Sequence, residues 1–193
     1  LIQRFCCKGR LKGKAMNPQN TLCLIVDIQE RLLPALSGAD EMVERCRLLI
    51  QGLTALDVPF AVTEQYPKGL GNTVSAVSLL LPEGTPVVEK TRFSAFLPEI
   101  QEILRKNNIK NVILVGAEAH ICMLQTALDL KAQGYAVSLP FECTASRTTA
   151  NRDNGLAQLS RQGITVSNVE SILFQLLGDA KHPAFKTISK LIQ

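Results

Sequence analysis

Short runs of branched apolar residues alternate with segments of helical periodicity along most of the chain, and residues 110–134 show this most clearly. Val112 to Val115 suit a strand that is buried on both faces of a parallel sheet, and Gly116 ends the run. Apolar residues then recur at helical spacing up to Gly134, which suits the position just after a helix C-terminus. A strand, a turn and a helix in this order form the repeating unit of parallel α/β sheets.

The same criteria predict six strands and the helices between them. The strands are expected at residues 22–26, 58–63, 87–88, 111–116, 135–139 and 164–166, the helices at 41–57, 73–80, 98–107, 121–133, 148–162 and 168–177, and loops at 64–72 and 141–146. Because strands and helices alternate throughout, the sequence predicts an α/β domain with a mostly parallel sheet and right-handed crossovers. Residues 16–193 are expected to form a single domain, which suits their number.

Charge and composition exclude several classes of protein. The formal net charge is +4, but residues 1–15 carry five of the 21 basic residues and no acid, which leaves 16 basic against 17 acidic residues elsewhere. A basic face for nucleic acid is therefore not expected, and aromatic residues for base stacking are scarce. No apolar run reaches the ~20 residues that a membrane-spanning helix requires. We accordingly expect neither a nucleic-acid partner nor a membrane partner.

Residues 1–15 are interpreted separately from the domain that follows. They lack the long apolar stretch of a secretory signal, and we read them as a leader or a disordered basic arm. The six cysteines show no C-x-x-C spacing, which favours a reduced, cytoplasmic setting. A mitochondrial role for the basic arm stays open.

Three residues that can carry chemistry follow predicted strands at their carboxyl ends. Asp27 comes directly after the first strand, Lys90 follows the third, and Cys122 lies in the first turn of the helix after the fourth. In open parallel sheets this edge holds the ligand site. The helix dipole and nearby N–H groups favour a thiolate at such a position, so Cys122 is a candidate nucleophile. A turn-forming Asp27, a solvated Lys90 and a buried structural Cys122 are the alternatives that the residues alone leave open.

Around these residues the sequence resembles the isochorismatase-like cysteine hydrolase family. The matching segments are Leu-Ile-Val-Asp27-Ile-Gln29, Val-Val-Glu-Lys90-Thr-Arg-Phe-Ser-Ala-Phe96 and Val-Gly-Ala-Glu-Ala-His-Ile-Cys122-Met-Leu-Gln-Thr-Ala, within about residues 20–177. The resemblance implies a Rossmann-like three-layer α/β/α sandwich whose six-stranded parallel sheet has the order 3-2-1-4-5-6. In that order strands one and four are neighbours at the topological switch point, so that Asp27 and Cys122 would face each other.

The resemblance also implies a mechanism that needs no cofactor. Asp27 would accept the thiol proton and later activate water, Lys90 would stabilise the charged groups, and Cys122 would attack a carbonyl to give a thioester. Backbone N–H groups of Glu118 and Cys122 would form the oxyanion hole, with a cis peptide between Ala117 and Glu118. We therefore expect a hydrolase of a small amide or a related carbonyl compound.

Nicotinamidases of this family carry a histidine-rich metal site after the second strand. Residues 63–72 contain no histidine here, so we expect neither a metal site nor nicotinamidase activity. The residues expected to contact the small-molecule substrate are Gln29, Leu33, Tyr66, Phe93, Phe96 and Glu118. A homo-oligomer is expected as well, from the resemblance and from the apolar residues of the last predicted helix and the C-terminal tail.

Two other functions stay open on the sequence. One is a non-catalytic protein that keeps this fold and an inactive triad. The other is a thiol-redox protein that uses Cys122 without acyl chemistry and has Cys143 as its resolving partner.

Overall fold

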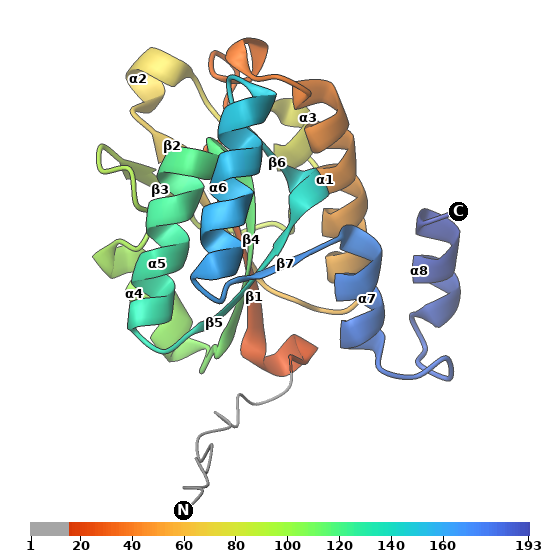
Figure 1. Ribbon diagram of the computed structural model, residues 1–193. Coiled ribbons are helices and arrows are strands. Elements are labelled where there is room, and N and C mark those ends of the chain that lie inside the picture. Colours follow the sequence, from red (N-terminus) through yellow and green to blue (C-terminus); the bar gives the residue numbers. More distant parts are fainter. Residues whose placement is uncertain (1–15) are drawn as a thin grey trace, which may run out of the picture.

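The computed structural model describes residues 16–193, which form a three-layer α/β/α sandwich around a parallel sheet (Figure 1). The strands are β1 (Thr21–Val26), β2 (Phe60–Gln65), β3 (Val87–Lys90), β4 (Asn111–Ala117), β5 (Ala136–Pro140), β6 (Thr144–Ala145) and β7 (Thr165–Ser167). Six of them run in the order β3-β2-β1-β4-β5-β7, and β6 pairs with the end of β4. The predicted fold class and strand order are confirmed, with β6 as an additional short strand.

Helices cover both faces of the sheet. The longer helices are α1 (Ala39–Thr54), α4 (Pro98–Lys106), α5 (Leu124–Ala132), α6 (Thr149–Arg161), α7 (Val169–Leu177) and α8 (Phe185–Leu191). Shorter helical segments are α2 (Pro67–Leu70), α3 (Ser75–Ser78), a π turn at Ala119–Met123, and 3-10 turns at Pro18–Asn20, Leu33–Ala35 and Phe141–Cys143. Helices α4, α5 and α6 pack on one face, and α1, α3, α7 and α8 pack on the other. Within residues 16–193 no helix is both long and apolar enough to cross a bilayer.

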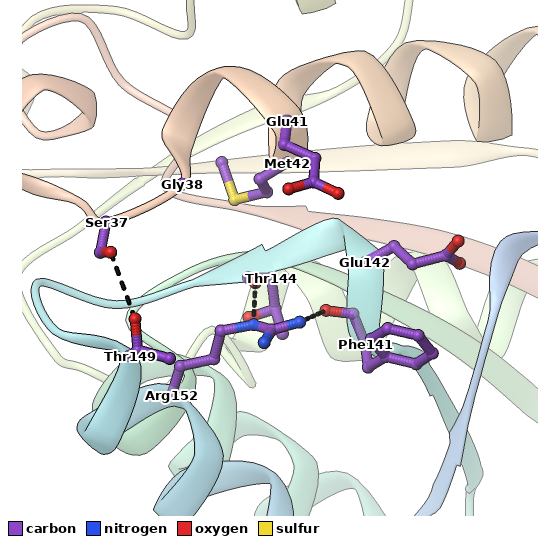
Figure 2. Close-up of a pocket in the computed structure, with 9 residues that line it drawn as sticks. All are labelled: Ser37, Gly38, Glu41, Met42, Phe141, Glu142, Thr144, Thr149 and Arg152. Atoms are coloured by element: carbon purple, nitrogen blue, oxygen red, sulfur yellow. Dashed lines mark hydrogen bonds between the residues drawn. The ribbon is translucent and has the colours of Figure 1, made fainter.

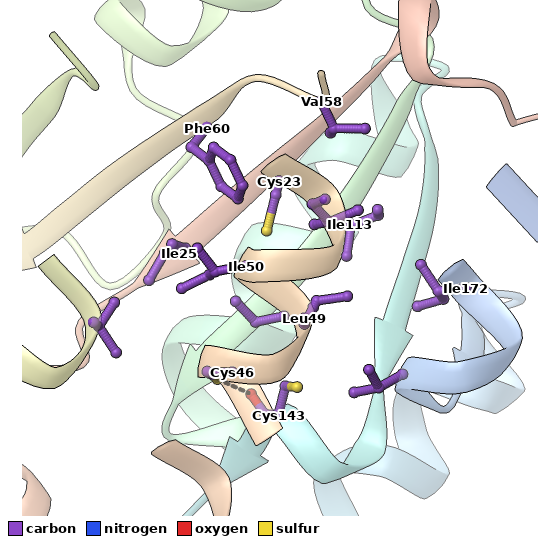
Figure 3. Packing of buried hydrophobic residues seen from close by; sticks show 14 of the residues in the cluster. Cys23, Ile25, Cys46, Leu49, Ile50, Val58, Phe60, Ile113, Cys143 and Ile172 are labelled. Carbon is purple, nitrogen blue, oxygen red and sulfur yellow. Dashed lines mark hydrogen bonds between the residues drawn. The ribbon is translucent and has the colours of Figure 1, made fainter. Parts of the chain in front are cut away.

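Alternate residues of β1 point to opposite faces and so divide the apolar interior into two cores. Leu24 and Val26 belong to the core beneath α4, α5 and α6, whereas Cys23 and Ile25 belong to the core beneath α1. Figure 3 shows the second core, in which Cys23 lies close to other buried apolar side chains of the sheet and of α1. A strand buried on both faces needs apolar residues at every position, which explains why these runs show no polar alternation.

Three segments differ from the sequence prediction. Residues 64–72 are not one polar loop, because β2 continues to Gln65 and α2 follows. Residues 141–146 contain a 3-10 turn and β6, which is only two residues long and so leaves no periodic signal. Residues 185–191 form α8, which packs Ile188 into the core beneath α1. The predictions made for residues 1–15 lie outside the described residues.

Gly116 allows the two central strands to approach closely next to the carboxyl edge. It pairs with Val26 of β1, and its φ is 143°, a value that residues with a side chain rarely adopt. A Cβ atom at this position would lie 2.0 Å from the carbonyl oxygen of Val26. Backbone cannot rotate away as a side chain can, so the register of β1 and β4 depends on the missing side chain.

We predict that Gly116→Ala destabilises the fold severely, by more than about 4 kcal/mol in urea unfolding, because the two central strands have to separate. Gly84→Ala is the matched control, since Gly84 also has a positive φ of 80° but a Cβ atom there would meet no described atom within 4 Å. The control is expected to lose only the ~1–2 kcal/mol of a strained backbone conformation. Equal losses in the two variants would contradict the close contact between β1 and β4.

Candidate active site

Asp27, Lys90 and Cys122 come together at the carboxyl edge of the sheet. The ammonium nitrogen Nζ of Lys90 lies 2.6 Å from Oδ2 of Asp27 and 3.9 Å from Sγ of Cys122. The Cys122 thiol also hydrogen-bonds the Asp27 carboxylate. All three residues are buried. The three side chains that the sequence places after three separate strands thus form one contact group, on β1, β3 and the turn after β4.

Lys90 is buried, and several oxygen atoms balance its charge. Besides Asp27, its Nζ donates to the side-chain Oε1 of Gln65 at 2.6 Å and contacts the carbonyl oxygens of Arg92 and Phe93 at 3.2 and 3.1 Å. A buried ammonium is tolerated only when it is paired and its three hydrogens are satisfied. Lys90 is therefore not the solvated lysine that a charged loop would suggest.

The backbone of Asp27 takes an unusual conformation that turns its carboxylate into the site. Its φ is 59°, in the left-handed region, where Asp is among the few residues tolerated. Its N–H donates to the carbonyl of Thr63, and the Thr63 hydroxyl donates to Oδ1 at 3.1 Å. With Lys90 on Oδ2 and Thr63 on Oδ1, both carboxylate oxygens are held in place. A left-handed backbone conformation such as that of Asp27 is common at functional sites and costs on the order of 1–3 kcal/mol.

The pKa of Cys122 corrects the expectation that its thiolate is favoured. Burial and then the negative charge of Asp27 raise the pKa of this thiol to about 12, although the positive charge of Lys90 lowers it. Burial likewise raises the pKa of the Asp27 carboxyl, against the charge and hydrogen bonds of Lys90. The position of Cys122 at a helix start suggested the opposite, because that expectation rested on the helix dipole and took no account of burial or of the charge of Asp27. With this pKa, the Cys122 side chain is a neutral thiol at physiological pH.

A neutral thiol hydrogen-bonded to a carboxylate can still supply a nucleophile when the proton moves. If the Cys122 proton passes to Asp27, the negative charge that held the thiol protonated disappears, and Lys90 then stabilises the thiolate alone. The raised pKa of Asp27 makes it a stronger base than an ordinary carboxylate. The two groups therefore share one proton beside a fixed positive charge.

The turn that carries Cys122 is a single π turn between β4 and α5. It begins after Glu118, whose φ and ψ of 57° and 67° reverse the chain direction, and the carbonyl of Glu118 accepts N–H groups on both sides of Cys122, from Ile121 at 2.9 Å and Met123 at 3.3 Å. The cis peptide expected between Ala117 and Glu118 is wrong, because every peptide bond in the described chain is trans. The turn is made by the left-handed conformation of Glu118 instead.

Helix α6 and a threonine of α5 hold this turn from outside. A Cβ atom on Gly155 of α6 would lie 2.8 Å from the carbonyl carbon of Ala119, so the helix backbone packs directly against the turn. The Thr126 hydroxyl donates to the carbonyl of Cys122 at 2.6 Å and accepts the N–H of Ala95 at 2.8 Å. Thr126 thereby links the nucleophile to the segment that follows Lys90. Thr63, Gln65 and Thr126 were not among the residues predicted from the sequence, because their roles follow from contacts across the fold.

The residues expected to contact substrate divide into two groups. Tyr66 and Phe93 are 57% and 53% exposed beside Lys90, and Tyr66 and Lys90 line the same cavity of about 400 Å³. Leu33 and Phe96 instead pack against the two cores, and Phe96 also makes an edge contact with the ring of Tyr135. Of these four residues, only Tyr66 and Phe93 are therefore largely exposed.

Gln29 is fully buried and its amide is occupied by backbone groups. Its Nε2 donates to the carbonyls of Gln65 at 3.0 Å and Gly71 at 2.7 Å, and its Oε1 accepts the N–H of Gln65 at 2.8 Å. Gln29 was expected to contact the substrate, but in the structure its amide is bound to the protein's own backbone. Its hydrogen bonds position the segment that contains Gln65, which in turn binds Lys90.

A separate cavity of about 340 Å³ lies between α1 and the segment from Phe141 to α6 (Figure 2). Its residues are Ser37, Gly38, Glu41, Met42, Phe141, Glu142, Thr144, Thr149 and Arg152. The guanidinium of Arg152 donates to the carbonyls of Thr144 and Phe141 at 2.9 and 2.6 Å. The guanidinium of Arg152 is therefore committed to the protein's own backbone.

The positions of Cys122 and Cys143 bear on the thiol-redox alternative that the sequence left open. Cys143 belongs to the core beneath α1, whereas Cys122 belongs to the core on the other face of the sheet. A disulfide between them would need a large rearrangement, since bridged Cα atoms lie within about 7 Å. For metals, residues 16–193 contain no group of three or more His, Cys, Asp and Glu residues that could hold an ion.

Comparison with known proteins assigns the chain to one family. The family model of the isochorismatase domain matches residues 21–171. The chain belongs to the isochorismatase family. Isochorismatase domain-containing protein 1 of Salmo salar is 41% identical over 177 residues, which cover 91% of this chain and 62% of the relative. This isochorismatase-family chain therefore spans less than two thirds of that relative.

Solved structures of the isochorismatase fold agree with this assignment. The structure of MAR1 ribonuclease from Caenorhabditis elegans is 37% identical and has a TM-score of 0.88, with 92% of this chain and 91% of that chain covered. The YcaC gene product of Escherichia coli, described as an octameric hydrolase of unknown specificity, has a TM-score of 0.85 at 16% identity over 93% of this chain and 89% of that one. The second likeness shows the fold alone.

We predict that alkylation of Cys122 by iodoacetamide rises about tenfold per pH unit from pH 7 to 10 without a plateau, because the thiol ionises only near pH 12. Asp27→Asn removes the charge that raises this pKa and should accelerate alkylation at pH 8. Lys90→Ala removes the charge that lowers it and should slow the reaction. Peptide mass spectrometry resolves Cys122 from the other cysteines. A plateau below pH 9, or the reverse order of the two variants, would contradict the assigned electrostatics.

Proposed function

We propose that this protein is a cysteine-dependent hydrolase of a small amide or a related carbonyl compound, acting through a thioester. The observation that carries the proposal is the contact group of Asp27, Lys90 and Cys122, in which a thiol is hydrogen-bonded to a carboxylate that a buried ammonium neutralises. These are the parts that nucleophilic catalysis requires: a nucleophile, a base in contact with it and a group that orients the base.

The first half-reaction transfers the acyl group to sulfur. Sγ of Cys122 forms a bond to the carbonyl carbon while its proton passes to Asp27, and the carbonyl oxygen becomes an oxyanion. Asp27 then returns the proton to the leaving nitrogen as the C–N bond breaks, which gives a thioester and an amine or ammonia. Lys90 compensates the negative charge that moves between carboxylate and sulfur.

The second half-reaction releases the acyl group as an acid. Asp27 takes a proton from water as the water oxygen attacks the thioester carbon, and the proton goes back to sulfur when the C–S bond breaks. Backbone N–H groups of Glu118 and Cys122 are the proposed oxyanion donors in both steps. One such donor is worth about 10²–10³ in rate where it has been removed. Two observations support this oxyanion hole: α6 packs against the turn, and the Glu118 carbonyl accepts hydrogen bonds from within the turn.

Ribonuclease activity is the second candidate, because the Caenorhabditis elegans structure with a TM-score of 0.88 bears that name. The buried thiol, carboxylate and ammonium suit acyl transfer better than attack on a phosphodiester. Charge also favours the first candidate, since residues 16–193 carry 16 basic and 17 acidic residues and give no general attraction to RNA.

We predict that the purified protein hydrolyses at least one member of a panel of small primary amides, measured as ammonia release. Cys122→Ala should abolish turnover, and Asp27→Asn should reduce it by about 10²–10⁴, the usual contribution of general acid–base catalysis. Turnover should survive a strong chelator, since no metal takes part in the proposed steps. Rapid quenching and intact mass spectrometry should reveal the thioester in wild type only.

The same panel includes single-stranded RNA as the competing substrate. RNA cleavage that persists in Cys122→Ala, without any amide hydrolysis in wild type, would replace the first candidate with the second. Amide hydrolysis that persists in Cys122→Ala would show that the thioester route is wrong.

We further propose that the protein is a homo-oligomer. Phe174 of α7 is 37% exposed and makes an edge contact with Phe185 of α8, so apolar rings reach the surface at the outer side of these helices. A second support is that the Escherichia coli YcaC gene product, which has the same fold, is described as octameric.

We predict a mass of at least two chains by light scattering at micromolar concentration, and Phe174→Glu should lower that mass. A monomeric wild type would contradict the proposal.

A further inference from the structure

The carboxylate of Glu118 is buried beside the nucleophile, and one of its oxygens lacks a partner. Its side chain is 8% exposed, and Oε1 pairs with Nε of Arg147 at 2.9 Å. Oε2 receives no hydrogen bond from any group in residues 16–193. Nδ1 of His120 lies 3.3 Å from Oε2, but outside hydrogen-bond geometry, and the same nitrogen lies 3.1 Å from the Ser146 hydroxyl. Oε2 is thus a buried acceptor without a donor.

Two other buried carboxylates within residues 16–193, those of Glu64 and Asp27, have hydrogen-bond donors. Oε1 of Glu64 accepts both the N–H and the hydroxyl of Thr73 at 2.6 and 2.8 Å, and Asp27 has a donor on each oxygen. A buried charged oxygen that lost its water and gained no donor costs more than a neutral group would. Native structures leave few such atoms, and each calls for a specific explanation. A bound ligand that donates a hydrogen to Oε2 supplies one.

Glu118 is also well placed to meet a ligand that reacts at Cys122. It directly precedes the π turn that contains Cys122, and its negative charge contributes to the raised pKa of that thiol. Arg147, its partner, follows β6, whose pairing with the last residues of β4 brings the two side chains together. Glu118 therefore adjoins the turn of the proposed nucleophile, and its carboxylate is near enough for its charge to act on the Cys122 thiol.

The charges around the site indicate what kind of donor fits. Asp27 is neutralised by Lys90 and Glu118 by Arg147, while Cys122 is a neutral thiol. A ligand with a net charge would leave that charge without a counterion in a largely buried site, which is unfavourable. A neutral ligand with an N–H group satisfies Oε2 and leaves both ion pairs intact.

We propose that Oε2 of Glu118 accepts a hydrogen bond from an N–H of the substrate, and that this contact makes the site selective for neutral primary amides over compounds of the same shape without an N–H. The inference rests on the proposed function for the identity of the reacting carbonyl. Glu118 acts here as a specificity-determining residue through its side chain, in addition to the role proposed for its backbone N–H.

Two alkylating agents of nearly the same shape test this without a known substrate. Iodoacetamide carries an NH₂ group where iodoacetone carries a methyl group. In both reactions Sγ of Cys122 forms a bond to the CH₂ carbon as iodide leaves, and the thiol proton goes to solvent. The rate constant for iodoacetamide is divided by that for iodoacetone at pH 9, and the quotient is normalised to that of glutathione. Both agents meet the same fraction of thiolate, so any change in the pKa of Cys122 cancels.

We predict a normalised selectivity of about 10- to 100-fold for wild type, the usual consequence of leaving a buried acceptor unpaired. Glu118→Gln should reduce it to about one, because the amide oxygen remains with Arg147 and an NH₂ group replaces Oε2. Arg147→Gln keeps the carboxylate and should retain the selectivity. Glu102→Gln, on an exposed helix position paired only with Lys106, is the matched surface control and should leave it unchanged.

The outcomes separate this inference from the proposed function. A wild-type selectivity near one overturns the inference whether or not amides are hydrolysed, and it needs no variant to fold. Loss of selectivity in Arg147→Gln but not in Glu118→Gln overturns it as well. Selectivity that depends on Glu118, in a protein that turns over no amide, supports recognition of the N–H and removes the hydrolase proposal.

Discussion

A lysine ammonium removed from water must be neutralised and fully hydrogen-bonded, and this requirement organises the carboxyl edge of the sheet. Lys90 contacts Asp27 directly after β1, Gln65 on β2 and the carbonyl groups that follow β3. Gln29 then fixes the backbone of Gln65. Removing either partner of a buried pair costs roughly 3–5 kcal/mol, because the other charge stays behind uncompensated. Three strands are therefore held together at one edge by a group whose positive charge also acts against the raised pKa of the Cys122 thiol.

The fold could be read from the sequence because its strands are buried on both faces. Continuous apolar runs such as Leu22 to Val26 mark such strands, and chain order with right-handed crossovers leaves few arrangements of them. The shortest elements could not be predicted in this way. β6 pairs only two residues with β4, and α2 has a single turn, so neither is long enough to show a period. Their existence depends on tertiary contacts.

The candidate site was predictable in its residues but not in its electrostatics. Asp27, Lys90 and Cys122 stand at strand ends, where position alone suggests a role. The sequence could not show that burial and Asp27 raise the pKa of Cys122, because both effects depend on distances between residues far apart in the chain. The pairing of Glu118 with Arg147 is of the same kind, since it exists only because β6 lies beside β4. Local signals locate functional groups, and packing decides their chemistry.

The neutral resting thiol has a consequence for how this protein behaves in a mixture of proteins. Peroxides and electrophilic reagents react with thiolates, so cysteines are sorted in such experiments by how much thiolate they carry at neutral pH. Cys122, with a pKa of about 12, would be passed over in such a survey alongside ordinary buried cysteines. Under the proposed mechanism, a search for this type of nucleophile has to offer a carbonyl compound that fits the site, because Asp27 takes the thiol proton as the carbonyl is attacked.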